Sequence, residues 1–414
     1  MTDEQLVPTD LERAPLVVED ERVVEAAPVK EPETPGEWIK LNLFSGPFNS
    51  ILTLIAGFMA IFLGFQIGRF VFVTADWTVI KVNWRLFMIG RFPLEEAWRA
   101  WFCLYLTVCL IGVSMGSSRF SFDPNPRARI RRGALGVLAS VGLLYVTTTT
   151  LVHLLIVGVV AVFALTYVSG RRLVVPRRTL LIAWLGWFVT VIVVLRGFGG
   201  VPPNEWGGFM LNLLLAVIAI VLSFPVGVLL AIGRRSTFPV IRTFCVGVIE
   251  FIRGVPLFTL LLFGEFVLQF LLPPGMRLPR IIRALFMITI FSAAYVAEIV
   301  RGGLQSVPTG QFEAAKALGL STTRTMGLIA LPQALRSTIP AMIGQFISLF
   351  KDTSLVAGIS FLELVYAARL APRLEFSGLT KETLLIAGLL FWIVGFSMGR
   401  WSQRLEKRLG VGER

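Results

Sequence analysis

Apolar runs long enough to cross a lipid bilayer recur along most of this chain. A helix that crosses about 30 Å of hydrocarbon needs roughly 20 residues, because each residue advances the helix by about 1.5 Å. Hydrophobic residues make up 55% of the 414 residues and charged residues only 16%, whereas soluble domains hold about 25% charged residues. The sequence therefore predicts an all-α, polytopic integral membrane protein.

We expect about ten membrane-spanning helices. In the N-terminal half they lie at 51–72, at 98–115, as two short spans within 133–168 joined near 147–150, and at 180–195. In the C-terminal half they lie at 209–232, 255–272, 281–300, 337–350 continuing toward 364, and 383–401. Two short spans are predicted within 133–168 because of the charged loops on either side. If the basic loops 117–132 and 171–178 are both cytoplasmic, the block between them crosses the membrane an even number of times. One long tilted span with a surface segment fits the length but not the charge.

Charge divides the chain into an acidic start and a basic remainder. Residues 1–37 hold 11 acidic and three basic side chains, whereas the rest hold 15 acidic and 36 basic ones. We predict that residues 1–40 form a disordered, acidic cytoplasmic tail without a signal peptide. Basic loops beside apolar spans indicate cytoplasmic loops rather than nucleic-acid binding, so both termini are placed in the cytoplasm.

The most specific motif is a polar stretch between two predicted spans. Glu313, Ala314 and Ala315 are followed by Gly319 and, nine residues later, by an Ile-x-Leu-Pro group made of Ile329, Leu331 and Pro332. Phe312, Ala315 and Leu318 share one helical face, and Ser321 can cap a second short helix. Pro332 suits the first turn of the next helix. An amphipathic loop lying on the membrane is the plain alternative.

This spacing resembles the "EAA" loop of bacterial ABC importer permeases. The resemblance implies that the loop 303–336 docks on a cytoplasmic ATPase, with Glu313 meeting a basic or amide partner and the small residues Ala314, Ala315 and Gly319 allowing close approach.

Charged residues also stand beside or within the apolar runs. Glu250 and Arg253 are spaced for a pair on one helix, and Gly254 and Pro256 interrupt that helix. Glu298 precedes an Arg-Gly-Gly group. Charges at membrane depth are costly and usually face a cavity, a partner or a substrate. The alternative for Glu250 to Pro256 is a turn at the cytoplasmic edge before a new span.

A further polar group comprises Lys351, Asp352, Thr353 and Ser354. Its carboxylate and hydroxyls could bind the ammonium of a zwitterion, while Lys351 or a helix N-terminus meets the carboxylate. The alternative for Lys351 and Asp352 is a structural pair. These stretches resemble the "FRGTP", "AYxAExxRGG" and "KDTSL" segments of polar amino-acid permeases, although Gly344 stands where many relatives carry Asn. The resemblance assigns the substrate pathway to a set of seven residues: Glu250, Arg253, Glu298, Lys351, Asp352, Thr353 and Ser354.

The sequence lacks the common motifs of nucleotide binding and catalysis that we looked for in it. It holds no Gly-x4-Gly-Lys-Ser/Thr phosphate loop, no Gly-x-Ser-x-Gly elbow and no His-Glu-x-x-His zinc motif. Cys103, Cys109 and Cys245 lie in apolar stretches and are interpreted as small hydrophobic residues rather than a disulfide or metal site. We therefore expect no cofactor or metal in this chain and no enzymatic activity, with ATP and magnesium on a partner ATPase.

The resemblance covers about 209–401. Because a long spanning region precedes this part, the chain also resembles the general L-amino-acid importers, and its segment around Trp77, Trp98 and Phe102 most resembles the second of their two permease subunits. The resemblance implies three regions: the tail 1–40, an extra transmembrane region 41–200, and a five-helix permease domain 201–414. It also implies a bacterial inner-membrane location and four kinds of partner: a homologous permease in a heterodimer, an ATPase dimer, an extracytoplasmic amino-acid-binding protein and the lipid bilayer. An ion-coupled secondary transporter and a membrane-anchored scaffold remain alternatives.

Overall fold

The structure, a computed structural model, describes residues 34–117, 150–173, 175–374, 376 and 378–409. Over these residues it is helical, and its one isolated backbone bridge joins Gly208 to Glu363. The predicted all-α membrane fold is confirmed. The chain divides into two compact units, 1–75 and 76–414, which are described separately.

The described part of the first unit, from residue 34 onward, is built from three consecutive helical segments: α1 (Pro35–Leu43), α2 (Pro47–Arg69) and the π-helix η1 (Phe70–Thr74). Thr34 and Glu37 form a reciprocal cap at the start of α1. Helix α2 is apolar on all sides, with Phe58 71% and Ile61 75% exposed, as expected for a helix in contact with lipid. The acidic tail predicted for 1–40 lies mostly outside the described residues.

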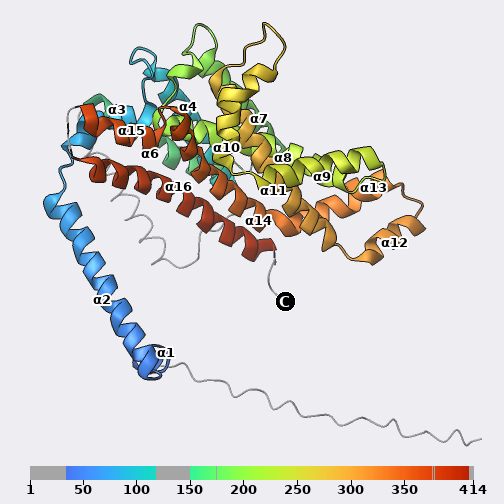
Figure 1. Ribbon diagram of the computed structural model, residues 1–414, viewed down its shortest axis with the longest axis horizontal. Helices are drawn as coiled ribbons and strands as arrows, with labels where there is room; N and C mark the ends of the chain where they lie inside the picture. Colours follow the sequence, from blue (N-terminus) through green and yellow to red (C-terminus); the bar gives the residue numbers. More distant parts are fainter. Residues whose placement is uncertain (1–33, 118–149, 174, 375, 377, 410–414) are drawn as a thin grey trace, which may run out of the picture. The chain divides into compact units, whose positions relative to one another are not determined.

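The second unit contains the remaining helical elements (Figure 1). In chain order they are α3 (Thr78–Ile89), α4 (Ala97–Ser117), α6 (Thr150–Arg172), α7 (Arg177–Arg196), η2 (Pro203–Glu205), α8 (Gly208–Arg234), α9 (Pro239–Gly254), α10 (Leu257–Leu262), η3 (Phe263–Val267), η4 (Leu268–Leu271), α11 (Arg280–Gln305), α12 (Thr309–Ala317), α13 (Thr322–Thr325), η5 (Met326–Ala330), α14 (Leu331–Asp352), η6 (Thr353–Ile359), α15 (Leu364–Leu374) and α16 (Thr380–Leu409).

Helix α11 is at the centre of this unit and packs against α8, α9 and α14. Small residues allow these helices to approach closely. A Cβ added at Gly227 of α8 would lie 2.7 Å from the carbonyl oxygen of Ala293 on α11, and one added at Gly303 of α11 would lie 2.7 Å from that of Ala334 on α14. Either substitution would push two helices apart, because no flexible side chain is available to yield at the backbone contact.

Seven described helices are long and apolar enough to cross a membrane, or eight if the bent pair of α9 and 257–271 counts as one span. This is fewer than the ten expected. Helix α14, in the expected span 337–350, does not reach the same hydropathy, and the first of the two short spans expected within 133–168 lies mostly outside the described residues, together with most of the basic loop 117–132. The second short span corresponds to α6.

The span expected at 255–272 is not one continuous helix. Residues 257–271 form a short α-helix, a π turn and a 3-10 turn, and they bend by 105° from α9. Gly254 ends α9 and Pro256 precedes α10, so the interruption predicted at these residues is confirmed. Proline has no N–H to continue the helical hydrogen bonds, which explains why the chain changes direction here.

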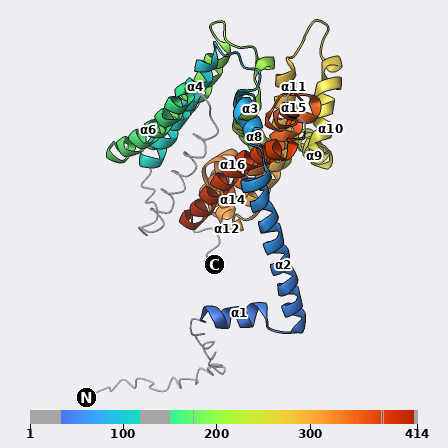
Figure 2. The same ribbon diagram turned by 90° about the vertical axis from the view of Figure 1, so that its left-hand side faces the viewer.

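The N-terminal helices α3, α4 and α7 pack within the same unit as the C-terminal helices. Phe92 and Leu195 belong to the same buried cluster as Leu211 and Leu261. Helices α4 and α6 lie side by side, as both ribbon views show (Figures 1 and 2). The boundary expected near residue 200 is therefore not a gap in packing, and a division of function there stays a prediction.

Candidate functional site

The polar segment between α11 and α14 forms a helical hairpin, residues 306–330, which contains α12, α13 and η5. It is shorter than the expected loop 303–336, because Gly303 to Gln305 continue α11 and Leu331 to Arg336 begin α14. Figure 1 shows the hairpin at one end of the second unit, away from α15 and α3. Any force applied to the hairpin therefore acts directly on two core helices.

Gly319 ends α12 in a left-handed conformation, with φ of 70°. The N–H of Leu320 donates to the Ala315 oxygen at 3.0 Å, and the N–H of Gly319 donates to the Lys316 oxygen at 3.0 Å. This is a Schellman cap, in which glycine is preferred because a Cβ disfavours positive φ. A Cβ at Gly319 would meet nothing within 4 Å, so the requirement within this chain comes from backbone conformation rather than space.

The starts of α13 and of α14, the helix after the hairpin, were predicted correctly. The Ser321 hydroxyl accepts a hydrogen bond from the N–H of Arg324 at 3.4 Å and caps α13. Pro332 lies in the first turn of α14, where its missing N–H costs little. The residues at these two helix starts thus specify where the helices of this region begin, without the help of distant contacts.

The outer surface of the hairpin differs from the expected one. Ala315 is buried at 1% exposure, so its small side chain serves packing within this chain, and Phe312 is half-buried with the Arg235 guanidinium 5.9 Å from its ring centre. Leu318 and Leu328 are instead 78% and 70% exposed. The other predicted docking residues divide into four exposed ones (Glu313, Ala314, Gly319 and Pro332) and two half-buried ones (Ile329 and Leu331).

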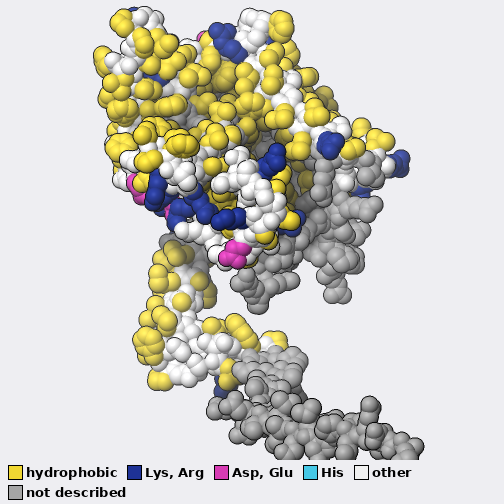
Figure 3. All heavy atoms as spheres, turned by 90° about the vertical axis from the view of Figure 1, so that its right-hand side faces the viewer, with side chains coloured by type: hydrophobic (Ala, Val, Ile, Leu, Met, Phe, Trp, Pro, Cys, Tyr) yellow, Lys and Arg dark blue, Asp and Glu magenta, His cyan; other side chains and the backbone are white. Residues whose placement is uncertain are grey.

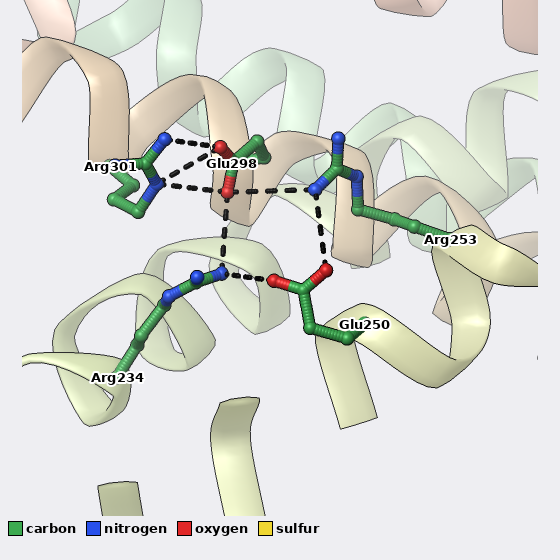
Figure 4. Close-up of polar contacts among 5 residues, drawn as sticks. All are labelled: Arg234, Glu250, Arg253, Glu298 and Arg301. Carbon is green, nitrogen blue, oxygen red and sulfur yellow. Dashed lines mark hydrogen bonds and ion pairs between the residues drawn. The ribbon is translucent and has the colours of Figure 1, made fainter. Parts of the chain in front are cut away.

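Five charged residues from three helices form an ion-pair cluster at the ends of α8, α9 and α11 (Figure 4). Glu298 of α11 pairs with Arg301 one turn later, and its Oε2 lies 3.4 Å from Arg234 Nη1 and 3.7 Å from Arg253 Nη1. Glu250 Oε1 lies 2.9 Å from Arg234 Nη1, and Glu250 Oε2 lies 4.0 Å from Arg253 Nη1. The predicted pair of Glu250 and Arg253 therefore exists but is the longest contact in the cluster.

The cluster joins the end of α9, one residue before the break at Gly254, to the helix that continues into the hairpin. Sequence reasoning placed Glu250, Arg253 and Glu298 in a substrate pathway but did not foresee Arg234 and Arg301 as their partners. The three-residue spacing of Glu298 and Arg301 could have revealed one of these pairs. Figure 3 views the end of the molecule that carries α12 and α13, where Lys and Arg side chains gather below a hydrophobic region. That distribution suits the cytoplasmic edge of a membrane protein.

The residues from Lys351 to Ser354 lie at the junction of α14 and η6. Lys351 is exposed, Asp352 and Ser354 are half-buried, and Thr353 is completely buried. Lys351 forms neither a hydrogen bond nor a salt bridge with any described residue. Its charge still acts on the neighbouring Asp352 carboxylate without a direct ion pair, so the Lys351 ammonium keeps its hydrogen-bond donors for another anion.

Thr353 belongs to a buried polar junction with Asn212 and Glu363, all three at 0% exposure. The Asn212 side-chain amide donates to Glu363 Oε2 at 3.0 Å and to Thr353 Oγ1 at 3.2 Å, while its oxygen accepts from the N–H of Leu364 at 3.1 Å. Thr353 itself donates to the Phe350 oxygen at 2.7 Å. Thr353 thus differs from a pathway-lining residue, since its hydroxyl is occupied and closed off from solvent.

Glu363 caps the start of α15. Its carboxylate accepts from the N–H of Tyr366 at 2.7 Å and from that of Val365 at 2.9 Å. Burial raises the pKa of the Glu363 carboxyl, whereas these backbone donors and the Asn212 amide lower it. Sequence reasoning missed Asn212 and Glu363, because a single polar residue in an apolar run does not identify its distant partner.

No cluster of three His, Cys, Asp or Glu side chains suited to a metal ion occurs among the described residues. Residues 223–411 match the family described as "Binding-protein-dependent transport system inner membrane component". The chain is 33% identical over 410 residues to the glutamate/glutamine/aspartate/asparagine transport system permease protein BztC of Rhodobacter capsulatus, covering 90% of this chain and 93% of that protein.

Two further relatives match different shares of this chain. The inner membrane amino-acid ABC transporter permease protein YhdY of Escherichia coli is 34% identical over 384 residues, covering 91% of this chain and 93% of the relative. The probable glutamine ABC transporter permease protein GlnP of Bacillus subtilis is 37% identical over 204 residues, covering 49% of this chain and 92% of the relative. Some relatives thus match nearly the whole chain, and others match about half of it.

Proposed function

The chain belongs to the binding-protein-dependent transport system inner membrane components, and from this premise we propose that it is the permease subunit of an ATP-driven importer of L-amino acids. Two relatives that match about nine-tenths of this chain are named as amino-acid permeases, one of them for glutamate, glutamine, aspartate and asparagine. The chain is a multi-pass membrane protein of an inner-membrane transporter family. Its proposed orientation has both termini in the cytoplasm.

The observation that supports coupling to an ATPase is the exposed apolar surface of the hairpin. Leu318 and Leu328 are 78% and 70% exposed on a polar hairpin, and Glu313 forms no hydrogen bond or ion pair with the described residues. Exposed apolar groups beside an unpaired charge are suited to a protein interface. We assign this surface, with Gly319 holding its geometry, to a cytoplasmic ATPase.

The proposed assembly contains four kinds of partner. A homologous permease forms the other half of the pore, two ATPase subunits carry ATP and magnesium, an extracytoplasmic protein delivers the amino acid, and lipid surrounds the spans. No cofactor is assigned to this chain and no role in nucleic-acid binding. The region 41–200 is proposed to enlarge the packed unit around the permease domain 201–414, since α3, α4 and α7 contribute to it.

Transport follows from the connection between the hairpin and the core. Closure of the ATPase pair would displace the hairpin and, with it, the inner ends of α11 and α14. The ion-pair cluster would pass that displacement to α8 and α9, because Glu298 of α11 contacts Arg234 and Arg253. The half-exposed charges at Glu250, Arg253 and Glu298, together with Lys351, Asp352 and Ser354, remain the proposed pathway, and Thr353 is proposed to position it.

The test replaces one exposed leucine of the hairpin. In Leu318→Asp, a charge at the interface should abolish co-purification of the ATPase in mild detergent and reduce ATP-dependent amino-acid uptake more than about tenfold, as expected for loss of a central apolar contact. The matched control is Met276→Asp, which changes an apolar residue that is 52% exposed in the loop before α11.

Both variants should reach the membrane at the level of the unaltered chain, and Met276→Asp should keep the ATPase and the uptake. Retention of a fully coupled ATPase by Leu318→Asp would refute the assignment of this surface. Uptake that collapses with an ionophore but survives ATP depletion would instead favour an ion-coupled transporter.

A further inference from the structure

A pocket of about 430 Å³ lies between α14 and α16. Lys351 supplies its one charged wall, and the remaining wall comes from α16: Gly388, Phe391, Trp392, Gly395 and Phe396. This volume is at the lower end of the range for small-molecule sites, which combine apolar walls with a few polar groups that orient the ligand. The pocket therefore has the size and composition for one small amphiphilic anion.

The position of the pocket along α16 places the charge of Lys351 deep in the membrane. Helix α16 is a candidate span that begins at Thr380, and the segment from Gly388 to Phe396 lies about 12 to 24 Å along its axis from that residue at about 1.5 Å per residue. This is the middle of a hydrocarbon layer about 30 Å thick. A charge at this depth requires a water-filled cavity or a partner of opposite charge. Asp352 acts on Lys351 only through space, without a hydrogen bond or direct ion pair among the described residues, so the pocket leaves the Lys351 ammonium open to an anion from outside the chain.

The pocket exists because α16 carries glycine where it faces α14. A Cβ added at Gly388 would meet nothing within 4 Å, and one added at Gly395 would make an ordinary contact of 3.7 Å with the stem of Lys351. Neither glycine is required by a positive φ. A larger side chain at either position would therefore be tolerated by the helices and would occupy the space of the pocket.

We propose that this pocket holds an L-amino acid during transport, with its carboxylate on the Lys351 ammonium and its side chain against Trp392 and Phe396. Gly388 and Gly395 then set the largest side chain that can pass. The proposal rests on the proposed function and adds to it the place of binding and the residues that determine specificity. The carboxylate is common to all amino acids, so a single lysine serves a broad range of substrates while the glycines select by size.

The first experiment compares Gly388→Leu with Gly186→Leu in cells that produce the complete transporter. At Gly186 on α7 an added Cβ also meets nothing within 4 Å, and this residue does not line the pocket. Initial uptake rates are measured for transported amino acids of different size. We expect the ratio of small-substrate to bulky-substrate uptake to rise about tenfold or more in Gly388→Leu, the scale of discrimination in a shape-selective apolar pocket, and to stay unchanged in Gly186→Leu.

The second experiment compares Lys351→Met with Lys351→Arg. Loss of a charge-assisted hydrogen bond should raise KM about 10- to 100-fold for all substrates in Lys351→Met, while Lys351→Arg should retain most of the affinity. An unaltered size ratio in Gly388→Leu would overturn the proposal, and so would an equal loss of uptake for small and bulky substrates in Gly388→Leu, as expected if lipid fills the pocket. If the unaltered transporter shows no ATP-dependent amino-acid uptake, the proposed function itself fails; if it does and the variants show no such effects, only the pocket assignment fails.

Discussion

The two polar assemblies that link distant helices, the ion-pair cluster and the buried polar junction, are built in opposite ways. The ion-pair cluster consists of charged side chains that remain between 24% and 52% exposed, and two of its contacts, at 3.7 and 4.0 Å, are longer than 3.4 Å. The buried polar junction consists of Asn212, Thr353 and Glu363, all at 0% exposure and joined by hydrogen bonds of 3.0 to 3.2 Å through Asn212.

The contrast between these two assemblies indicates which part of the molecule can rearrange. Exposed ion pairs contribute about 0 to 1 kcal/mol each and re-form readily with water or new partners. A buried polar group that loses its partner costs about 1 to 3 kcal/mol, and more when it is charged. The end that carries the hairpin is therefore suited to movement, and the junction between α8, η6 and α15 is suited to holding a fixed position.

The largest effect is expected at the centre of the buried polar junction. Asn212→Ala removes the side chain that satisfies Glu363, Thr353 and the N–H of Leu364, so unfolding should become easier by about 3 kcal/mol. Thermal unfolding in detergent measures this loss. The control is Asn83→Ala on α3, since the Asn83 amide donates only to Val79 within its own helix. An equal loss of stability in Asn212→Ala and Asn83→Ala would contradict the special role of the buried polar junction.

An intermediate effect is expected at Gly319. A β-branched residue disfavours positive φ, so Gly319→Val should weaken the end of α12 by about 1 to 2 kcal/mol and lower ATP-dependent uptake. Gly319→Asn should keep most of the uptake, because asparagine tolerates the left-handed conformation. Uptake rates normalised to the amount of transporter in the membrane distinguish the two. Equal loss in both variants would point to a partner that needs the bare glycine surface.

The smallest effect on stability is expected in the ion-pair cluster. Glu250→Gln removes a carboxylate that is 52% exposed, so the free energy of unfolding should fall by less than about 1 kcal/mol, and the difference should shrink at high salt. Thermal unfolding at two salt concentrations checks this prediction. A cost as large as that of Asn212→Ala would remove the contrast between the two assemblies.

Much of the secondary structure and part of the candidate site could be predicted from the chain alone. The cap at Ser321, the start of α14 at Pro332 and the break at Gly254 and Pro256 all follow from local backbone chemistry, and the structure confirms them. The outward direction of Leu318 could not be predicted in this way, because helical spacing groups it with Phe312 and Ala315. Only the packing of those two residues against the core turns them inward.

Local chemistry along the chain specifies a bundle of membrane-spanning helices with a polar hairpin, because hydrophobicity, turn residues and caps act over short distances. Which polar groups meet depends instead on how the helices pack in three dimensions. Asn212 reaches Glu363 across 151 residues, and Arg234 reaches Glu298 across 64. Such partners depend on how helices cross and which faces they bury, and no local pattern of residues specifies that geometry.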